Sequence, residues 1–295
     1  MKILVPLDVS GQSESALAFL ARRPQFTQDS EVSLLTVHQT IRPSLMRVIA
    51  KEDIERIQKA TADEIFARAK PYFNALGQTP KMLTAEGDPT AKILETAKNL
   101  PADLIVMGAH GERTLGDILL GSVSRGVLSK STCPVVLLRK QLPPAGRPMK
   151  IVVPVDSQEV TCHAVDWILE NRHLFSPQTD FRLVHSVPSS TLDVLPRFTT
   201  PTHALEEQPT HAPRNAEWHQ AVDPVAQRFA EAGLTSRNIA LTGRASQAIA
   251  DYVTKEEIDF IIIGSHARGE LKALFLGSVA AEVMTLTQVP MLIVR

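Results

Sequence analysis

The residues that could do chemistry in this sequence are three glycines and a serine between two short apolar runs. They are Gly108, Gly111, Gly121 and Ser122. Glycine lets a backbone approach a ligand closely, and the start of a helix offers N–H groups to an anion. A helical pattern begins at the Gly-Ser pair, so the order is strand (Leu104–Met107), glycine loop, helix and strand (Val135–Leu138). This order is typical of an anion-binding loop.

The spacing Gly-x2-Gly-x9-Gly-Ser is neither the P-loop nor the dinucleotide fingerprint. It resembles the ATP-binding signature of the universal stress protein family, and Met107 and Val123-Ser124 extend the match. The resemblance implies that ATP is the ligand, with Mg or Mn carried by its phosphates, since no carboxylate cluster is present to hold a cation. The implied site consists of Pro6, Asp8, Val37, Gly87, Met107, Gly108, His110, Gly111, Gly121, Ser122, Val123 and Ser124.

Several of these residues also have ordinary structural explanations. Asp8 follows the first apolar run and can accept hydrogen bonds from ribose or adenine, but it is equally suited to cap a helix. Val37 suits a hydrophobic core, and Gly87 suits a turn. In the family-based interpretation the hydroxyls of Ser122 and Ser124 bind phosphate; otherwise they cap a helix.

The pattern occurs twice. KILVPLD at Lys2 returns as KIVVPVD at Lys150, and Gly108, Gly121 and Pro134 have counterparts in Gly264, Gly277 and Pro290. The second copy retains a weaker set of site residues, namely Asp156, Gly264, Gly277 and Ser278. Ala267 stands where the motif has its second glycine, and Ala280 replaces the hydroxyl of Ser124. We therefore expect the second copy to bind nucleotide more weakly than the first, or not at all.

The surrounding elements predict an α/β fold with two tandem doubly wound domains, each an open, mostly parallel five-stranded sheet with helices on both faces. The resemblance implies the adenine nucleotide α-hydrolase-like type. We expect residues 1–141 and 150–295 to form the domains and 142–149 an extended, exposed linker. The expected strands are Ile3–Leu7, Val32–Val37, Lys81–Ala85, Leu104–Met107 and Val135–Leu138, then Ile151–Val155, Phe181–Val184, Asn238–Leu241, Phe260–Ile263 and Met291–Val294.

Three further features concern helices, a loop and the domain contact. Ser10 and Ser13 are expected to cap the first helix, and a long helix near residues 48–76 is expected to bury Ile54, Ile57, Ile65 and Ala69. The proline-rich stretch Pro188–Pro213 predicts a surface excursion. The last strand of each half would be an exposed apolar edge, so we expect the two to pair and form an intramolecular pseudo-dimer. A homodimer is also compatible with the resemblance.

Composition excludes other classes of function. The 295 residues carry a formal net charge of −1, which gives no electrostatic basis for binding nucleic acid or an anionic membrane. No apolar run is long enough to span a bilayer, and Met1-Lys2 leads directly into a strand, so we expect a cytoplasmic protein without a signal peptide. Cys133 and Cys162 show no metal-binding spacing and are expected to be free thiols.

The leading interpretation is a universal stress protein that binds ATP in its first half and acts as a stress-response signalling or protective module. It is not expected to be an enzyme, beyond at most a very slow ATPase, because no P-loop lysine or recognisable catalytic set is present. One alternative is an adenine-nucleotide α-hydrolase-type enzyme that cleaves ATP to AMP and pyrophosphate. Another is a structural pairing module with vestigial sites.

Overall fold

The computed structural model describes residues 1–10, 13–40, 49–109, 120–139, 141–156, 159–187, 216–265 and 277–295. The first half contains the strands β1 (Lys2–Leu7), β2 (Glu31–His38), β3 (Lys81–Glu86), β4 (Leu104–Gly108) and β5 (Val135–Leu138). Its helices are α1 (Glu14–Arg22), α3 (Lys51–Asn74), α4 (Pro89–Asn99) and α5 (Ser122–Lys130), with a short 3₁₀ turn η1 (Pro24–Phe26).

The second half repeats this series. Its strands are β6 (Lys150–Pro154), β7 (Asp180–Val187), β8 (Ser236–Thr242), β9 (Phe260–Gly264) and β10 (Met291–Val294). Its helices are α6 (Glu159–Glu170), α7 (Ala216–Glu231), α8 (Ala245–Lys255) and α9 (Ser278–Leu286), with the 3₁₀ turn η2 (Arg172–Leu174). All ten expected strands are confirmed; β5 and β10 have the expected bounds, and the others differ by one to three residues at their ends.

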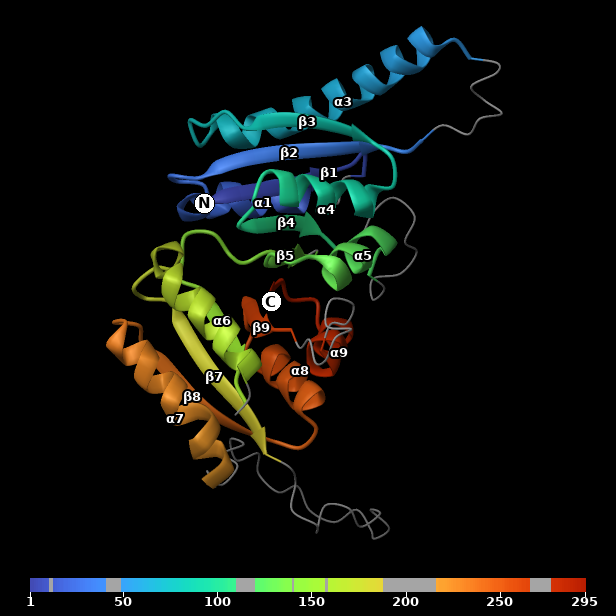
Figure 1. The fold of residues 1–295 in the computed structure, drawn as a ribbon. Coiled ribbons are helices and arrows are strands. Elements are labelled where there is room, and N and C mark those ends of the chain that lie inside the picture. The colour runs from blue at the N-terminus through green and yellow to red at the C-terminus, as the bar shows by residue number, and fades with distance from the viewer. Residues whose placement is uncertain are drawn as a thin grey trace, which may run out of the picture.

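The strands form one ten-stranded sheet in the order β3-β2-β1-β4-β5-β10-β9-β6-β7-β8 (Figure 1). Strands within each half are parallel, as predicted for a doubly wound domain. The halves meet where β5 pairs antiparallel with β10, and Val136 lies opposite Leu292. The predicted pairing of the last strands is therefore confirmed, and it merges the two sheets into one.

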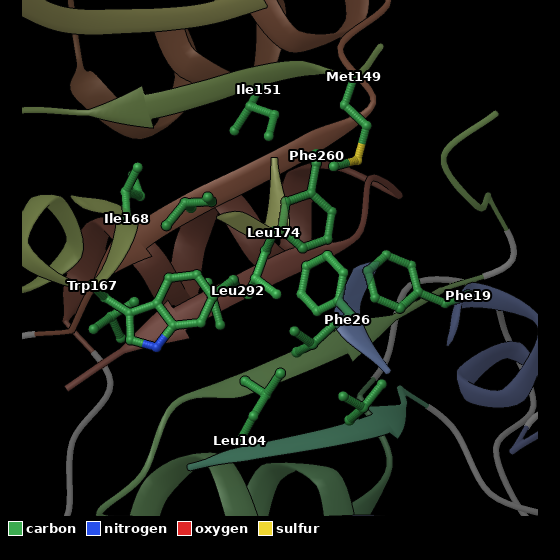
Figure 2. Packing of buried hydrophobic residues seen from close by; sticks show 14 of the residues in the cluster. Phe19, Phe26, Leu104, Met149, Ile151, Trp167, Ile168, Leu174, Phe260 and Leu292 are labelled. Atoms are coloured by element: carbon green, nitrogen blue, oxygen red, sulfur yellow. The ribbon is translucent and has the colours of Figure 1, made fainter. Parts of the chain in front are cut away.

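Helices cover both faces of this sheet, and each face has a core shared by the two halves. Helices α1, α3, α6 and α7 pack on one face, while α4, α5, α8 and α9 pack on the other. Figure 2 shows the first core near the junction, where Phe19 of α1 stacks on Phe260 of β9 with centroids 5.9 Å apart. Apolar contact thus continues across the boundary between the halves.

Helix α3 departs from the sequence-based expectation in one respect. Ile54, Ile65 and Ala69 are buried as predicted, but Ile57 is 59% exposed. In Figure 1 the helix runs past the ends of the neighbouring strands. The prediction of a buried Ile57 was wrong because Ile57 lies beside, not on, the buried stripe of this helix, which runs from Ile54 through Ala62 to Ala69.

The linker is more firmly attached than its composition predicts. Arg23, which follows α1, donates hydrogen bonds to the Pro144 carbonyl at 2.5 Å and the Arg147 carbonyl at 3.3 Å. Arg147 in turn pairs with Asp259 at 2.8 Å. Pro143 and Met149 are buried, and within the linker residues 145–148 are exposed. The expectation of an exposed linker therefore holds for this short stretch alone.

Some predictions concern residues outside those described here. They include His110, Gly111, Ala267 and the whole of Pro188–Pro213. Within the described residues, no helix is long and apolar enough to cross a membrane.

Candidate functional site

A cavity of about 430 Å³ lies at the carboxyl ends of β1, β2 and β4. The chain adds β2 and β3 on one side of β1 and then crosses to add β4 and β5 on the other side. The strand order therefore reverses at β1, and ligands in open α/β sheets bind at such a switch point. Nine of the predicted site residues line the cavity together: Pro6, Asp8, Val37, Met107, Gly108, Gly121, Ser122, Val123 and Ser124. A volume of this size is within the range of small-molecule sites.

Hydroxyl groups hold the Asp8 carboxylate and its backbone in place. Ser10 Oγ donates to Asp8 Oδ1 at 2.6 Å, and Ser13 Oγ lies 3.2 Å from the Asp8 carbonyl and 3.0 Å from the Ser10 carbonyl. Ser13 is at the N-cap position of α1 but makes no side-chain cap. The prediction that Ser10 and Ser13 cap this helix was therefore wrong, since their hydroxyls bind within the Asp8 loop. Asp8 does not cap α1 either.

The N-terminus of α5 faces the cavity without a side-chain cap. Gly121 occupies the N-cap position, and Ser122 and Val123 begin the helix at the cavity wall. The first N–H groups of a helix have no partner within it, and together with the helix dipole they favour an anion. By contrast, α4 is capped by Asp88, whose Oδ1 accepts the Ala91 N–H at 2.8 Å.

Two predicted phosphate donors already have partners. The Gly121 N–H donates to the Ala109 carbonyl at 2.9 Å, which closes the glycine loop at its base. Ser124 is 4% exposed, and its Oγ donates to the Gly108 carbonyl at 3.0 Å. A hydroxyl has only one hydrogen to donate, so Ser124 as arranged here ties α5 to β4 and does not donate to a phosphate. The Ser122 hydroxyl remains available on the exposed side of the helix start.

Gly87 does not line the cavity, although Pro89 nearby does. The φ angle of Gly87 is 139°, a conformation that side chains rarely adopt, and its N–H donates to the His38 carbonyl at 2.9 Å. The alternative interpretation, a glycine required by the turn after β3, accounts for this residue.

The cavity also contains residues that sequence reasoning missed. They come from the end of β2, from α3 and from α4, and include Thr36, His38, Gln39, Thr61, Ile65 and Ile93. The β2 residues follow from the rule that ligands lie beyond the carboxyl ends of strands. No sequence signal places α3 over the cavity, because that depends on how the long helix packs.

The apolar and polar parts of the lining are separated by element. Val37, Leu35 and Ile93 offer an apolar surface suited to a flat aromatic base, while Asp8 offers an acceptor. The uncapped α5 offers donors to an anion. Within the described residues no group of three or more His, Cys, Asp or Glu residues could hold a metal ion.

At the corresponding place in the second half, more polar side chains replace those of the first. His185 of β7 stands at the position of Thr36, since Leu35 pairs with Pro6 and Val184 with Pro154. His185 is 8% exposed, and its Nδ1 lies 2.7 Å from the Val155 carbonyl, so Nδ1 carries the hydrogen. Ser186 stands at the position of Val37, and its Oγ donates to the Gly243 carbonyl at 2.8 Å.

The start of the corresponding helix is retained, but a carboxylate follows in the middle of that helix. Gly277 and Ser278 begin α9 as Gly121 and Ser122 begin α5. Glu282 stands where the first half has Gly126, and it accepts hydrogen bonds from Ser246 Oγ at 2.6 Å and from Arg244 at 2.9 Å. It therefore ties α9 to the start of α8, where the first half has the close contact of Gly126 with Thr90.

Comparison with known proteins agrees with this architecture. A model of the universal stress protein family matches residues 1–139 and again 148–295. Universal stress protein YxiE of Bacillus subtilis is 33% identical over 149 residues, covering 47% of this chain and 98% of that protein. A universal stress protein of Mycolicibacterium smegmatis is 25% identical over 313 residues, covering 99% of this chain and 96% of its own.

A solved structure supports the arrangement of both halves. The crystal structure of a universal stress protein from Archaeoglobus fulgidus superimposes with a TM-score of 0.72. The match covers 100% of this chain and 98% of that chain at 20% sequence identity. At this identity the likeness shows a shared fold.

Proposed function

Because the chain belongs to the universal stress protein family, we propose that its first half binds ATP and that the protein acts as a stress-response signalling or protective module. The observation that carries the proposal is the convergence of nine predicted site residues on one cavity at the switch point of the first sheet. The apolar surface formed by Val37, Leu35 and Ile93 would hold adenine, and Asp8 would accept from the nucleoside.

The phosphates would lie at the start of α5. Its first N–H groups and the Ser122 hydroxyl supply donors, and Gly111 in the preceding loop is expected to let the backbone come close. Mg or Mn would be bound through the phosphate oxygens. These groups bind and orient a triphosphate; hydrolysis additionally needs an oriented water and stabilisation of developing charge. The proposed role is therefore binding, with at most very slow ATP hydrolysis, in the cytoplasm.

We further propose that the second half binds nucleotide weakly or not at all. His185 and Ser186 support this proposal, because they stand at the positions of Thr36 and Val37, as do the sequence changes Ala267 and Ala280. Ala280 lacks the hydroxyl with which Ser124 ties α5 to β4.

A matched pair of substitutions tests this division. Asp8→Asn removes the acceptor charge while preserving the shape that Ser10 contacts, and Asp156→Asn makes the same change in the second half. We expect Asp8→Asn to weaken ATP binding at least about tenfold, the effect of losing roughly 1.4 kcal/mol, and Asp156→Asn to leave it unchanged. Titration calorimetry on the full chain measures both. Equal effects of the two substitutions would contradict the assignment to the first half.

A further inference from the structure

Arg68 of α3 reaches from above the cavity to the loop that carries Asp8. Its Nη2 donates to the Asp8 carbonyl at 3.0 Å and its Nη1 to the Val9 carbonyl at 3.3 Å. Nη1 also lies 3.5 Å from Glu14 Oε1. One guanidinium thus joins two consecutive carbonyls of the Asp8 loop to the first turn of α1.

This contact acts on the backbone of the loop, whereas Ser10 fixes the side chain of Asp8. Loops after strands lack the ladder hydrogen bonds that fix the strands themselves, so donors must come from elsewhere. Arg68 has a planar fork of donors that can hold two acceptors in a fixed relation, which the single ammonium of lysine cannot do. The same helix supplies Thr61 and Ile65 to the cavity wall, so Arg68 also fixes the distance between that wall and Asp8.

Within the described residues of the second half, a proline stands where the first half has Arg68. Phe73 and Phe229 are buried at corresponding places near the ends of α3 and α7, and Gly77 and Gly233 follow them in the same left-handed conformation. Counting back from these residues places Pro224 at the position of Arg68. Proline has no group that could donate to the loop before α6. Among the described residues, this contact, the Arg68 clamp, is made in the half whose cavity gathers the predicted site residues.

We propose that Arg68 is a positioning residue that holds the Asp8 loop in the conformation required by the nucleoside end of the ligand. The inference rests on the proposed function, because it concerns the same cavity. Arg68 does not line the cavity; it acts through the backbone of Asp8 and Val9. The phosphates are assigned to the start of α5, at the other end of the site, and are not touched by this clamp.

The test compares ligands with and without phosphates. Arg68→Met keeps the length of the side chain and removes both donors. We expect it to weaken the binding of adenosine and of ATP by the same factor, about tenfold, which corresponds to a loss near 1.4 kcal/mol of binding free energy. Arg68→Lys should recover part of the loss. Arg228→Met is the matched control, since Arg228 pairs with Asp166 between α7 and α6 of the second half and should not change affinity.

A double-mutant cycle separates positioning from general destabilisation. If Arg68 acts through Asp8, Arg68→Met should reduce the affinity for ATP little further in protein that already carries Asp8→Asn. In protein that carries Ser122→Ala, the losses of binding free energy should add. Additive losses with Asp8→Asn as well as with Ser122→Ala would overturn the proposal. A larger loss of affinity for ATP than for adenosine would also overturn it, because that would indicate direct contact between Arg68 and the phosphates. If wild-type protein binds ATP and Arg68→Met binds it equally well, the inference about Arg68 is refuted but the proposed function is not. Wild-type protein that binds neither ligand refutes the proposed function as well.

Discussion

Residues around the cavity have two roles: some offer groups to a ligand, and others hold the cavity walls in place. Asp8 has the first role, and Ser124 and Gly126 have the second. Asp8 lines the cavity, and the serines near it serve its loop. Ser124 ties α5 to β4 through the Gly108 carbonyl. Gly126 has a related role on the outer side of α5, because it allows the helix to approach Thr90 of α4 closely. A Cβ atom at position 126 would lie 2.7 Å from both Cγ2 and Oγ1 of Thr90.

We therefore expect Gly126→Ala to displace α5 from α4 and, with it, the helix start that faces the cavity. Overpacking of this kind typically costs about 1–3 kcal/mol, so thermal unfolding should shift down and ATP affinity should fall several-fold. Adding Thr90→Ala removes both clashing atoms and should restore most of the loss. An affinity unchanged in Gly126→Ala would show that the position of α5 does not matter for the ligand.

Residue types and spacing could predict which positions belong to the site, but not what each side chain bonds to. Asp8, Gly108 and Ser122 follow from spacing and strand ends, and the structure brings them together. The partners of Ser13 and Ser124 could not be predicted, since a serine near a helix start has several carbonyls and N–H groups within reach. Gly87 was assigned to the site, but its left-handed conformation accounts for it.

At the scale of elements, the two halves use the same strand positions for different purposes. Glu31 of β2 pairs with Lys81 of β3 at 3.0 Å, and both side chains are largely exposed. The equivalent Asp180 and Arg237 pair on β7 and β8, where they join Arg182, whose side chain is 4% exposed. Arg182 also bonds Glu256 at 2.8 Å. The second sheet edge is therefore held by a partly buried ionic network, and the first by an exposed pair.

This difference predicts a difference in pH dependence. Burial would raise the pKa of Asp180, but the hydrogen bond from Arg237 and the charge of Arg182 outweigh it, so the pKa lies below its ordinary value of 3.8. A carboxylate with a lowered folded pKa stabilises the fold above its unfolded pKa, and this stabilisation is lost as the pH falls through the folded pKa.

We expect Asp180→Asn to lower the melting temperature at pH 7, and the difference from wild type to shrink as the pH is reduced below about 4. Glu31→Gln is the control and should change stability little, because exposed pairs contribute only about 0–1 kcal/mol. Thermal unfolding followed between about pH 3 and 7, a range that includes the ordinary carboxylate pKa values, measures the change in melting temperature of both variants. A difference that grows toward low pH would contradict the sign of this argument.

The elements themselves were the most predictable part of the protein. The inner strands β4, β5, β9 and β10 are almost uninterrupted apolar runs, because parallel strands in the middle of a sheet are covered on both faces. The edge strands β3 and β8 carry more polar residues, but short apolar stretches still mark them in the sequence. Helix α3 was predicted, but the reach of its N-terminal turns past the sheet was not. The placement of α3 is decided by contacts with α1 and β2 that are distant in sequence.

For the whole molecule, the duplicated halves behave as a dimer within one chain. Beyond the pairing of β5 with β10, Arg139 donates to the Met284 carbonyl of α9 at 2.5 Å, and Arg295 donates to the Leu128 carbonyl of α5. Each arginine follows the last strand of its own half and binds near the C-terminus of a helix in the other, where a positive charge is favoured. Burial lowers the pKa of both side chains.

We expect a charge in this junction to destabilise both halves together. Leu137 is buried in β5 opposite Met291, so Leu137→Glu places an unpaired carboxylate among apolar side chains at a cost of several kcal/mol, about 3 or more. Calorimetry should show a single transition shifted to lower temperature. Met82→Glu, on the exposed edge strand β3, should have little effect. Two separate transitions, with only the first half shifted, would show that the halves fold independently.

If only the first half has an intact site, the difference between the halves determines how many nucleotides one chain binds. The most direct measurement is quantitative mass spectrometry of nucleotide released from protein purified and equilibrated with ATP. We expect about one adenine nucleotide per chain, in line with one intact and one altered site. Release of none, or of two per chain with equal affinity, would contradict it.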